Sequence, residues 1–230
     1  MGETNWIAAD YPGAARYRCA ARHGGKARRH GAAVLAAGTV AAVLSGCASG
    51  TTVESQAQQV YFQVPSGWRV FDKAQLEGGA LVPALSGSAA PQFLAVASAG
   101  PRPQPGVVFT ASDYPWVLSL VRPLSPSEQA NISFEGLSDV VFNVDQAAQF
   151  GTSVQFNSQP QILVHGDLRG TRLSVDYNGD VDYVQVAWVN PATDKVWVLM
   201  AGCSLTCFQR QQGAIDRVVQ SFYVSDRGTR

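Results

Sequence analysis

TRLSVDYNGDVDYVQVAWVNPATDKVWVLMA, residues 171–201, is the stretch that decides the fold of this chain of 230 residues. It contains three runs rich in β-branched and aromatic residues, Thr171–Tyr177, Tyr183–Val189 and Lys195–Ala201. Turn-forming residues separate the runs, at Asn178-Gly179 and at 190–194. Short runs of this composition, bounded by turn residues, are typical of strands. The stretch therefore predicts three consecutive antiparallel strands.

The length of the loop between the first two of these strands decides which residues lie opposite each other. A two-residue loop at Asn178-Gly179 would place Tyr177 beside Asp180 and Val175 beside Asp182. Because a sheet with one buried face keeps apolar residues opposite apolar residues, a longer loop is favoured.

Further strands are expected on the N-terminal side of this stretch. The candidates share apolar or alternating composition and Gly, Pro or Ser at their ends: Val60–Pro65, Gln92–Ala97, Val107–Ala111, Trp116–Arg122, Val154–Phe156 and Gln161–His165. Together with the helices below, they predict an α+β fold, an antiparallel sheet of about six strands with helices packed on it.

Two helices are predicted from capping signals and helical spacing. Ser125, Pro126 and Glu128 form a capping-box pattern with proline at the first helical position. The apolar residues that follow, at helical spacing, extend this helix to a point before Gly151: Ala130, Phe134, Leu137, Val141 and Val144. The second helix closes the domain, with Ser204 or Thr206 as its cap and an apolar face made of Phe208, Ile215, Val218, Val219 and Phe222.

The first 46 residues have the character of an export signal. Six basic side chains, from Arg16 to Arg29, precede an uncharged apolar segment, Ala32–Ser45, which is too short for the roughly 20 residues that span a bilayer. The chain leaves this segment through Leu44-Ser45-Gly46-Cys47, which resembles the lipobox of bacterial lipoproteins. That resemblance implies removal of residues 1–46, lipid attachment to Cys47, and anchoring at the extracytoplasmic face of the cell membrane.

The rest of the chain then divides into a tether, a domain and a tail. Residues 47–59 are small and polar and are expected to form a lipidated, flexible tether. Residues 60–224 form the single domain, and residues 225–230 form a disordered tail. Beyond residue 46 there are eleven basic and fifteen acidic side chains, a net charge of −4 that disfavours nucleic acid as a partner.

Cys203 and Cys207 are the two cysteines left after removal of the signal and lipidation of Cys47. In an exported domain they predict a disulfide. Four residues of extended strand span about 13 Å, beyond the roughly 7 Å that a disulfide allows, so Cys203 should end a strand and Cys207 should follow in a turn. A redox role is the alternative, although the spacing is C-x3-C rather than C-x2-C.

Catalytic and metal-binding patterns are not found in the sequence. His165 is the one histidine after residue 46, which excludes a zinc site built on several histidines, and no G-x-S-x-G motif supplies a nucleophile. Four polar residues at the tip of the predicted hairpin, Asp176, Asn178, Asp180 and Asp182, suggest Ca²⁺, but their spacing departs from an EF-hand loop. We therefore expect no enzyme, no metal and no cofactor.

Trp188 and Trp197 lie in neighbouring predicted strands. If both point to the same side of the sheet, they could line a pocket for an apolar ligand between sheet and helix. Aromatic side chains on one face of a strand are more often part of the core. The two tryptophans are therefore a weak candidate ligand site.

Four segments resemble the PsbP-like α/β/α sandwich, a group that includes actinobacterial envelope lipoproteins of the LpqN/LpqT type. They are VPSGW at Val64–Trp68, Gly170-Thr-Arg-Leu, the Tyr183–Val198 hairpin and the ending Val218-Val-Gln-Ser-Phe222. The resemblance implies the sandwich fold and a binding or accessory role. It supplies no catalytic residues to carry over.

These observations give one leading hypothesis and two alternatives. The leading hypothesis is a non-catalytic, lipid-anchored binding or accessory protein of the cell envelope, whose partner is an envelope protein, a lipid or a cell-wall component. The first alternative is a carrier of an apolar or lipid ligand near Trp188 and Trp197. The second is a secreted hydrolase that uses His165.

Overall fold

The computed structural model describes residues 50–76, 89–133, 136–137 and 153–225. The predicted export signal, Cys47 and residues 226–230 of the predicted tail lie outside these ranges. The described elements are, in chain order, β1 Thr51–Ser55, β2 Val60–Val64, β3 Arg69–Asp72, α1 Lys73–Leu76, β4 Phe93–Ser98, the 3₁₀ turn η1 Pro105–Val107, β5 Trp116–Pro123, α3 Pro126–Asn131, β6 Val154–Phe156, β7 Gln161–His165, β8 Leu168–Tyr177, β9 Val181–Val189, β10 Lys195–Ser204, α5 Leu205–Ser221 and β11 Tyr223–Val224.

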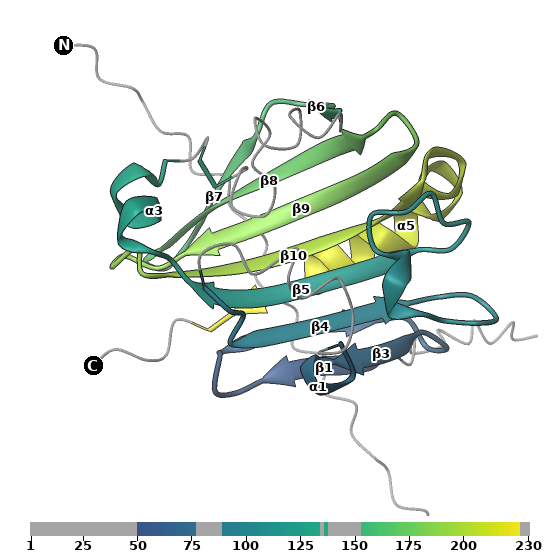
Figure 1. Cartoon of the computed structure of the whole chain (residues 1–230), viewed down its shortest axis with the longest axis horizontal. Coiled ribbons are helices and arrows are strands. Elements are labelled where there is room, and N and C mark those ends of the chain that lie inside the picture. The colour runs from purple at the N-terminus through teal and green to yellow at the C-terminus, as the bar shows by residue number, and fades with distance from the viewer. Residues whose placement is uncertain (1–49, 77–88, 134–135, 138–152, 226–230) are drawn as a thin grey trace, which may run out of the picture. The chain divides into compact units, whose positions relative to one another are not determined.

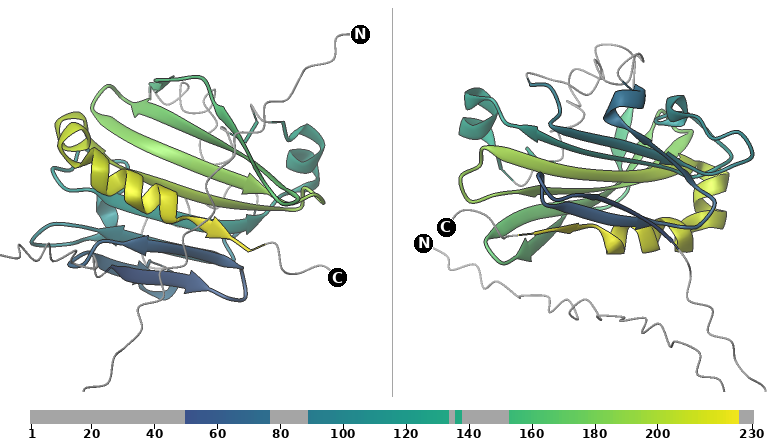
Figure 2. Two further views of the ribbon diagram at one scale, coloured as in Figure 1. Left: turned by 180° about the vertical axis from the view of Figure 1, so that it is seen from behind. Right: turned by 90° about the horizontal axis from the view of Figure 1, so that it is seen from below.

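Eight of the described strands form one antiparallel sheet, in the order β3-β4-β5-β10-β9-β8-β6, with β7 also paired to β8. The predicted α+β class is confirmed, with a sheet somewhat larger than expected. α5 and a small sheet lie on one side of the large sheet, and α1 and α3 lie on the other (Figures 1 and 2). Of the helices that the structure describes, none combines the length and apolar character needed to cross a membrane.

β10 shows why the central strands are almost uniformly apolar. Trp197 and Leu199 pack with the α5 side of the sheet, whereas Val198 and Met200 pack with the opposite side. Because both faces are covered, alternate residues are buried in different cores rather than one set facing water. Residues 196–203 are all buried as a result.

The small sheet has the order β1-β2-β11 and corrects one expectation. Residues 51–55 lie in the segment predicted to be a flexible tether, but they form β1 and pair with all five residues of β2. Val53 is buried and provides the apolar contact that holds this otherwise polar strand. The folded domain therefore begins at Thr51 rather than Val60.

The hairpin between β8 and β9 has the longer loop that apolar pairing favours. Tyr177 pairs with Val181, and Val175 pairs with Tyr183, so three residues form the loop. Asn178 and Gly179 have φ values of 60° and 73°, the left-handed conformation that these two residue types tolerate best.

The predicted helix that starts at Ser125 and the predicted strand at 107–111 differ from the structure. The capping box of Ser125 and Glu128 is confirmed, but α3 ends at Asn131, and residues 138–152 of the predicted longer helix lie outside the described ranges. Residues 107–111 do not form the predicted strand. Pro105 begins a 3₁₀ turn there, and Phe109 has a φ of 60°, which no strand residue adopts.

The last helix and the cysteines agree with the sequence-based expectation. α5 is capped by Ser204, whose Oγ accepts a hydrogen bond from the backbone N–H of Cys207 at 3.4 Å. Cys203 lies near the end of β10 and forms a disulfide with Cys207 in the first turn of α5, with 5.8 Å between the Cα atoms. The disulfide joins the sheet to the helix that covers it.

Candidate binding cleft

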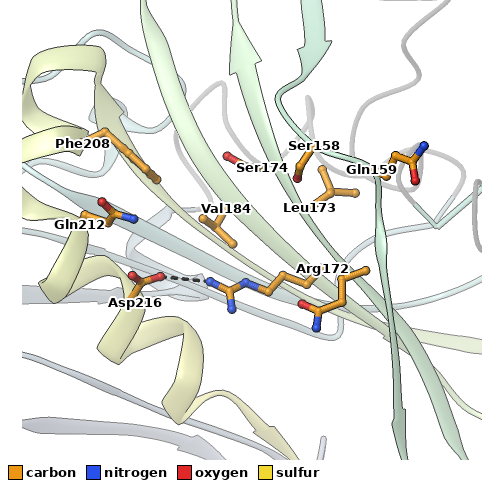
Figure 3. Close-up of a pocket in the computed structure, with 10 residues that line it drawn as sticks. Ser158, Gln159, Arg172, Leu173, Ser174, Val184, Phe208, Gln212 and Asp216 are labelled. Carbon is orange, nitrogen blue, oxygen red and sulfur yellow. Dashed lines mark hydrogen bonds and ion pairs between the residues drawn. The ribbon is translucent and has the colours of Figure 1, made fainter. Parts of the chain in front are cut away.

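A cleft of about 290 Å³ lies between α5 and the edge of the large sheet (Figure 3). This volume is just below the roughly 300–1,000 Å³ typical of ligand sites. The lining residues come from α5, from β8 and β9, and from the start of β7 with the segment before it: Ser158, Gln159, Gln161, Arg172, Leu173, Ser174, Val184, Phe208, Gln212 and Asp216.

The helical wall of the cleft is built by a four-residue spacing. Phe208, Gln212 and Asp216 recur at i, i+4 and i+8, which places them on one side of α5. The neighbouring side of the helix carries Cys207 and Ile215, both fully buried against the sheet. The buried contacts of Cys207 and Ile215 therefore fix the rotation of α5 about its axis, and this rotation keeps Phe208, Gln212 and Asp216 on the cleft.

An ion pair lines the cleft. A guanidinium Nη of Arg172 lies 3.0 Å from Oδ1 of Asp216, linking β8 to α5 (Figure 3). Both side chains are about one-third exposed or less, at 27% and 32%, so solvent screens the pair and its contribution to stability is modest. Its main consequence for binding is that the two charges in the cleft neutralise each other.

The remaining polar side chains of the cleft have free hydrogen-bonding capacity. The side-chain amides of Gln159, Gln161 and Gln212 make no hydrogen bond to any residue that the structure describes. The same is true of the hydroxyls of Ser158 and Ser174. Each amide offers two donors and one acceptor, and each hydroxyl offers both functions. The half-buried ring of Phe208 adds one apolar surface.

The two predicted ligand-site tryptophans do not line this cleft. Trp188 and Trp197 are directly paired across β9 and β10 and lie on the α5 side of the sheet. Trp197 is buried in the core, and its Nε1 donates to the carbonyl of Gln58 at 2.7 Å. Trp188 is half-buried, and its indole lies against Gly170. Both positions agree with the core interpretation of these residues.

His165 lies at the end of β7, beside two aromatic rings. Its ring centroid is 6.3 Å from that of Trp188 and 5.2 Å from that of Tyr223. In the part of the chain that the structure describes, no serine or aspartate makes a hydrogen bond to His165. His165 is therefore part of an aromatic cluster with Trp188 and Tyr223.

Two carboxylates at the tip of the β8–β9 hairpin accept hydrogen bonds from nearby residues. Oδ1 of Asp176 accepts from the N–H of Gly179 at 2.7 Å, and Oδ1 of Asp182 accepts from the side-chain amide of Asn157 at 3.0 Å. Burial raises the pKa of Asp182, the Asn157 bond opposes that rise, and the charge of Asp176 adds to it. No group of three or more potential metal ligands occurs among the described residues.

Sequence reasoning missed the cleft because its residues are distant in the chain. Ser158 and Gln159 precede the short strand β7, which begins at Gln161, and Arg172 and Asp216 are separated by 44 positions. The one local signal is the polar side of the last helix, where Gln212 and Asp216 interrupt an apolar pattern. Polar residues on a helix usually face water, so that signal alone could not identify a site.

Comparisons with known proteins bear on the fold. No protein-family model matches the sequence, and no curated protein matches it. Among solved structures, the chain is similar to cyanobacterial PsbP from Synechocystis sp. PCC 6803, with 13% identity, a TM-score of 0.52, and coverage of 84% of this chain and 99% of that one.

A second similar structure is LpqN of Mycobacterium tuberculosis, which is described as involved in cell envelope biogenesis. Here the identity is 13% and the TM-score is 0.47, with coverage of 77% of this chain and 91% of that one. The chain has an eight-stranded antiparallel sheet that α5 covers on one face, and it is similar to cyanobacterial PsbP. We conclude that this chain has the PsbP-like α+β fold.

Proposed function

We propose that this protein is a lipid-anchored, extracytoplasmic, non-catalytic binding protein of the cell envelope, and that its cleft binds a hydroxyl-rich, uncharged wall component. Two features support the location: the lipobox-like sequence ending at Cys47 and the disulfide between Cys203 and Cys207. Disulfides persist in oxidising compartments outside the cytoplasm.

The observation that carries the binding role is the chemistry of the cleft. Paired Arg172 and Asp216 leave no net charge for a charged ligand to bind. Five amide and hydroxyl side chains remain available, and each can meet a ligand hydroxyl as donor or acceptor. Phe208 offers an apolar face to the C–H groups of a sugar ring. An uncharged saccharide has this combination of hydroxyls and apolar C–H surface.

The anchor is tested by membrane fractionation of the exporting host. The wild-type protein should sediment with the membranes, and Cys47→Ala should move it to the soluble extracytoplasmic fraction because the acyl chains are lost. Retention of Cys47→Ala in the membrane fraction, at wild-type abundance, would contradict the lipid anchor.

The cleft is tested by titrating the purified full-length protein, in detergent, with uncharged glycan fragments of the host's cell wall. Gln212→Ala removes two donors and an acceptor and should weaken binding about tenfold. Gln211→Ala is the matched control, since Gln211 is exposed on the same helix but does not line the cleft. Equal affinities of the two variants would contradict the assignment of the cleft.

Native mass spectrometry separates this proposal from the apolar-ligand alternative. The protein purified from the exporting host should carry no lipid beyond its covalent anchor. A co-purifying lipid that dissociates on denaturation would favour the carrier instead, and Trp188→Phe would then be the variant to examine for its loss.

A further inference from the structure

The domain lies only a short length of chain from the residue that would be lipidated. Cys47 precedes the first residue of β1, Thr51, by four positions. Four residues of fully extended chain span at most about 14 Å. The sequence alone had suggested a tether reaching to residue 59, so the formation of β1 greatly shortens the connection.

The point at which the chain enters the domain is well defined. Thr51 pairs with Val64, the last residue of β2, and a Cβ on Gly50 would lie 2.8 Å from the carbonyl oxygen of Val64. The turn that follows Val64, residues 65–68, is therefore the part of the domain next to the anchor. The N–H of Trp68 closes this turn on the carbonyl of Pro65 at 3.3 Å.

The strand register brings a second loop to the same end of the sheet. Arg69, the first residue of β3, pairs with Ser98, and Ser98 pairs with Trp116. The connection from β4 to β5, residues 99–115, therefore starts and finishes beside the 65–68 turn. Figure 1 shows β1 beginning at the same end of the strands as this connection.

The 65–69 segment and the 99–115 connection both carry side chains of the types that favour a lipid–water interface. Trp68 is half-buried, and Tyr114 is 47% exposed. Arg69 and Arg102 are exposed in the same two segments, which carry one exposed carboxylate, Asp113, and the neighbouring β8–β9 hairpin tip adds exposed Asp180. Tryptophan and tyrosine are enriched where membrane meets water, and each arginine near an anionic surface contributes about 1 kcal/mol.

We propose that this end of the domain, residues 65–69 together with the 99–115 connection, rests on the lipid headgroups of the membrane. The inference depends on the lipidation of Cys47 given under Proposed function. Headgroup layers are roughly 5–7 Å thick on each side of the hydrocarbon core. A connection of about 14 Å or less between Cys47 and Thr51 therefore keeps the 65–68 turn at the membrane surface. On α5, Ser221 accepts a hydrogen bond from the N–H of Gln63 in β2 and does not line the cleft.

The experiment uses the full-length protein, lipidated in its host and reconstituted into vesicles of phosphatidylethanolamine and phosphatidylglycerol that contain a spin-labelled quencher lipid. A fluorophore is attached to Ser66→Cys, in the turn next to the anchor. The control label is at Ala192→Cys, in the exposed turn between β9 and β10 at the opposite end of the sheet. Quenching at position 66 should exceed quenching at position 192 several-fold.

Flotation of the vesicles, measured first, distinguishes the two ways in which the idea can fail. Protein that does not float with the vesicles overturns both the lipid anchor and the docking surface. Protein that floats but shows equal quenching at positions 66 and 192 overturns the docking surface and leaves the anchor standing.

A charge variant adds a second test on the same vesicles. Arg69→Gln with Arg102→Gln should reduce quenching at position 66 without changing flotation, because the acyl chains still hold the protein. The matched control is Arg169→Gln with Arg217→Gln, which removes two arginines away from this end and should leave quenching unchanged. An equal effect of the two double variants would contradict a role for the two arginines at this end.

Discussion

Arg122 and Glu128 form a two-point ion pair, with guanidinium nitrogens 2.6 and 3.1 Å from the two carboxylate oxygens. The same carboxylate accepts the N–H of Ser125 at 2.7 Å and so completes the capping box of α3. Arg122 is 3% exposed in its side chain, whereas Glu128 is 30% exposed. One carboxylate therefore both compensates a buried charge on β5 and begins the helix that follows.

We expect Glu128→Gln to destabilise the domain by about 2–3 kcal/mol, because the buried guanidinium of Arg122 loses its ion pair with the Glu128 carboxylate. The free energy of unfolding is measured by urea titration. Arg122→Met combined with Glu128→Gln removes the buried charge as well and should recover part of the loss. A double variant less stable than Glu128→Gln would contradict this explanation.

Gly170 in β8 should not tolerate a side chain. A Cβ there would lie 2.4 Å from the carbonyl oxygen of Ala187 and 2.7 Å from the indole of Trp188. Gly170→Ala should therefore cost about 1–3 kcal/mol in urea titrations and change the near-ultraviolet circular dichroism of the displaced indole.

Gly213→Ala is the control for that substitution, since nothing lies within 4 Å of a Cβ at this position in α5. Alanine is favoured over glycine inside a helix, so this variant should gain about 0.5–1 kcal/mol. Equal destabilisation by both alanines would show that the loss does not come from the contact with Trp188.

Asp182 should make the stability of the domain depend on pH in a defined direction. Because burial raises its pKa in the folded state, the charged form is disfavoured there, and stability rises as the pH falls from neutral towards the ordinary value of 3.8. Asp182→Asn should be more stable than wild type at neutral pH, and this difference should shrink as the pH approaches 3.8.

The comparison is made by urea titration at several pH values. Asp180→Asn, at an exposed position of the same hairpin, controls for the removal of one negative charge. A stability difference between Asp182→Asn and wild type that stays constant from pH 7 to about pH 4 would contradict the raised pKa.

The disulfide between Cys203 and Cys207 should contribute about 2 kcal/mol, the value expected for so short a loop. Replacing both cysteines by alanine should lower the urea midpoint while leaving the far-ultraviolet circular dichroism unchanged, since α5 keeps its buried contacts. Peptide mapping of the oxidised wild-type protein should recover one cross-linked peptide. Two free thiols would contradict the pairing.

The sequence predicted the elements whose patterns are local. The meander from Thr171 to Ala201, the cap at Ser125 and the last helix each follow from residues within a few positions of one another. β1 was missed because Val53 alone is buried among polar neighbours, and its pairing partner β2 supplies the rest of its stability. The cleft was missed because pairing between distant strands brings its residues together.

The small sheet places the two ends of the domain on either side of one strand. β2 pairs with β1, the first strand of the domain, and with β11, the last. Any process that delivers the chain from its N-terminus, whether synthesis or translocation, supplies β11 only when the domain is nearly complete. Until then, Val60 and Tyr61 have no partner on one side. The domain therefore reaches its final form in a late closing step, and a chain that stalls before residue 223 exposes an unpaired strand edge to its neighbours.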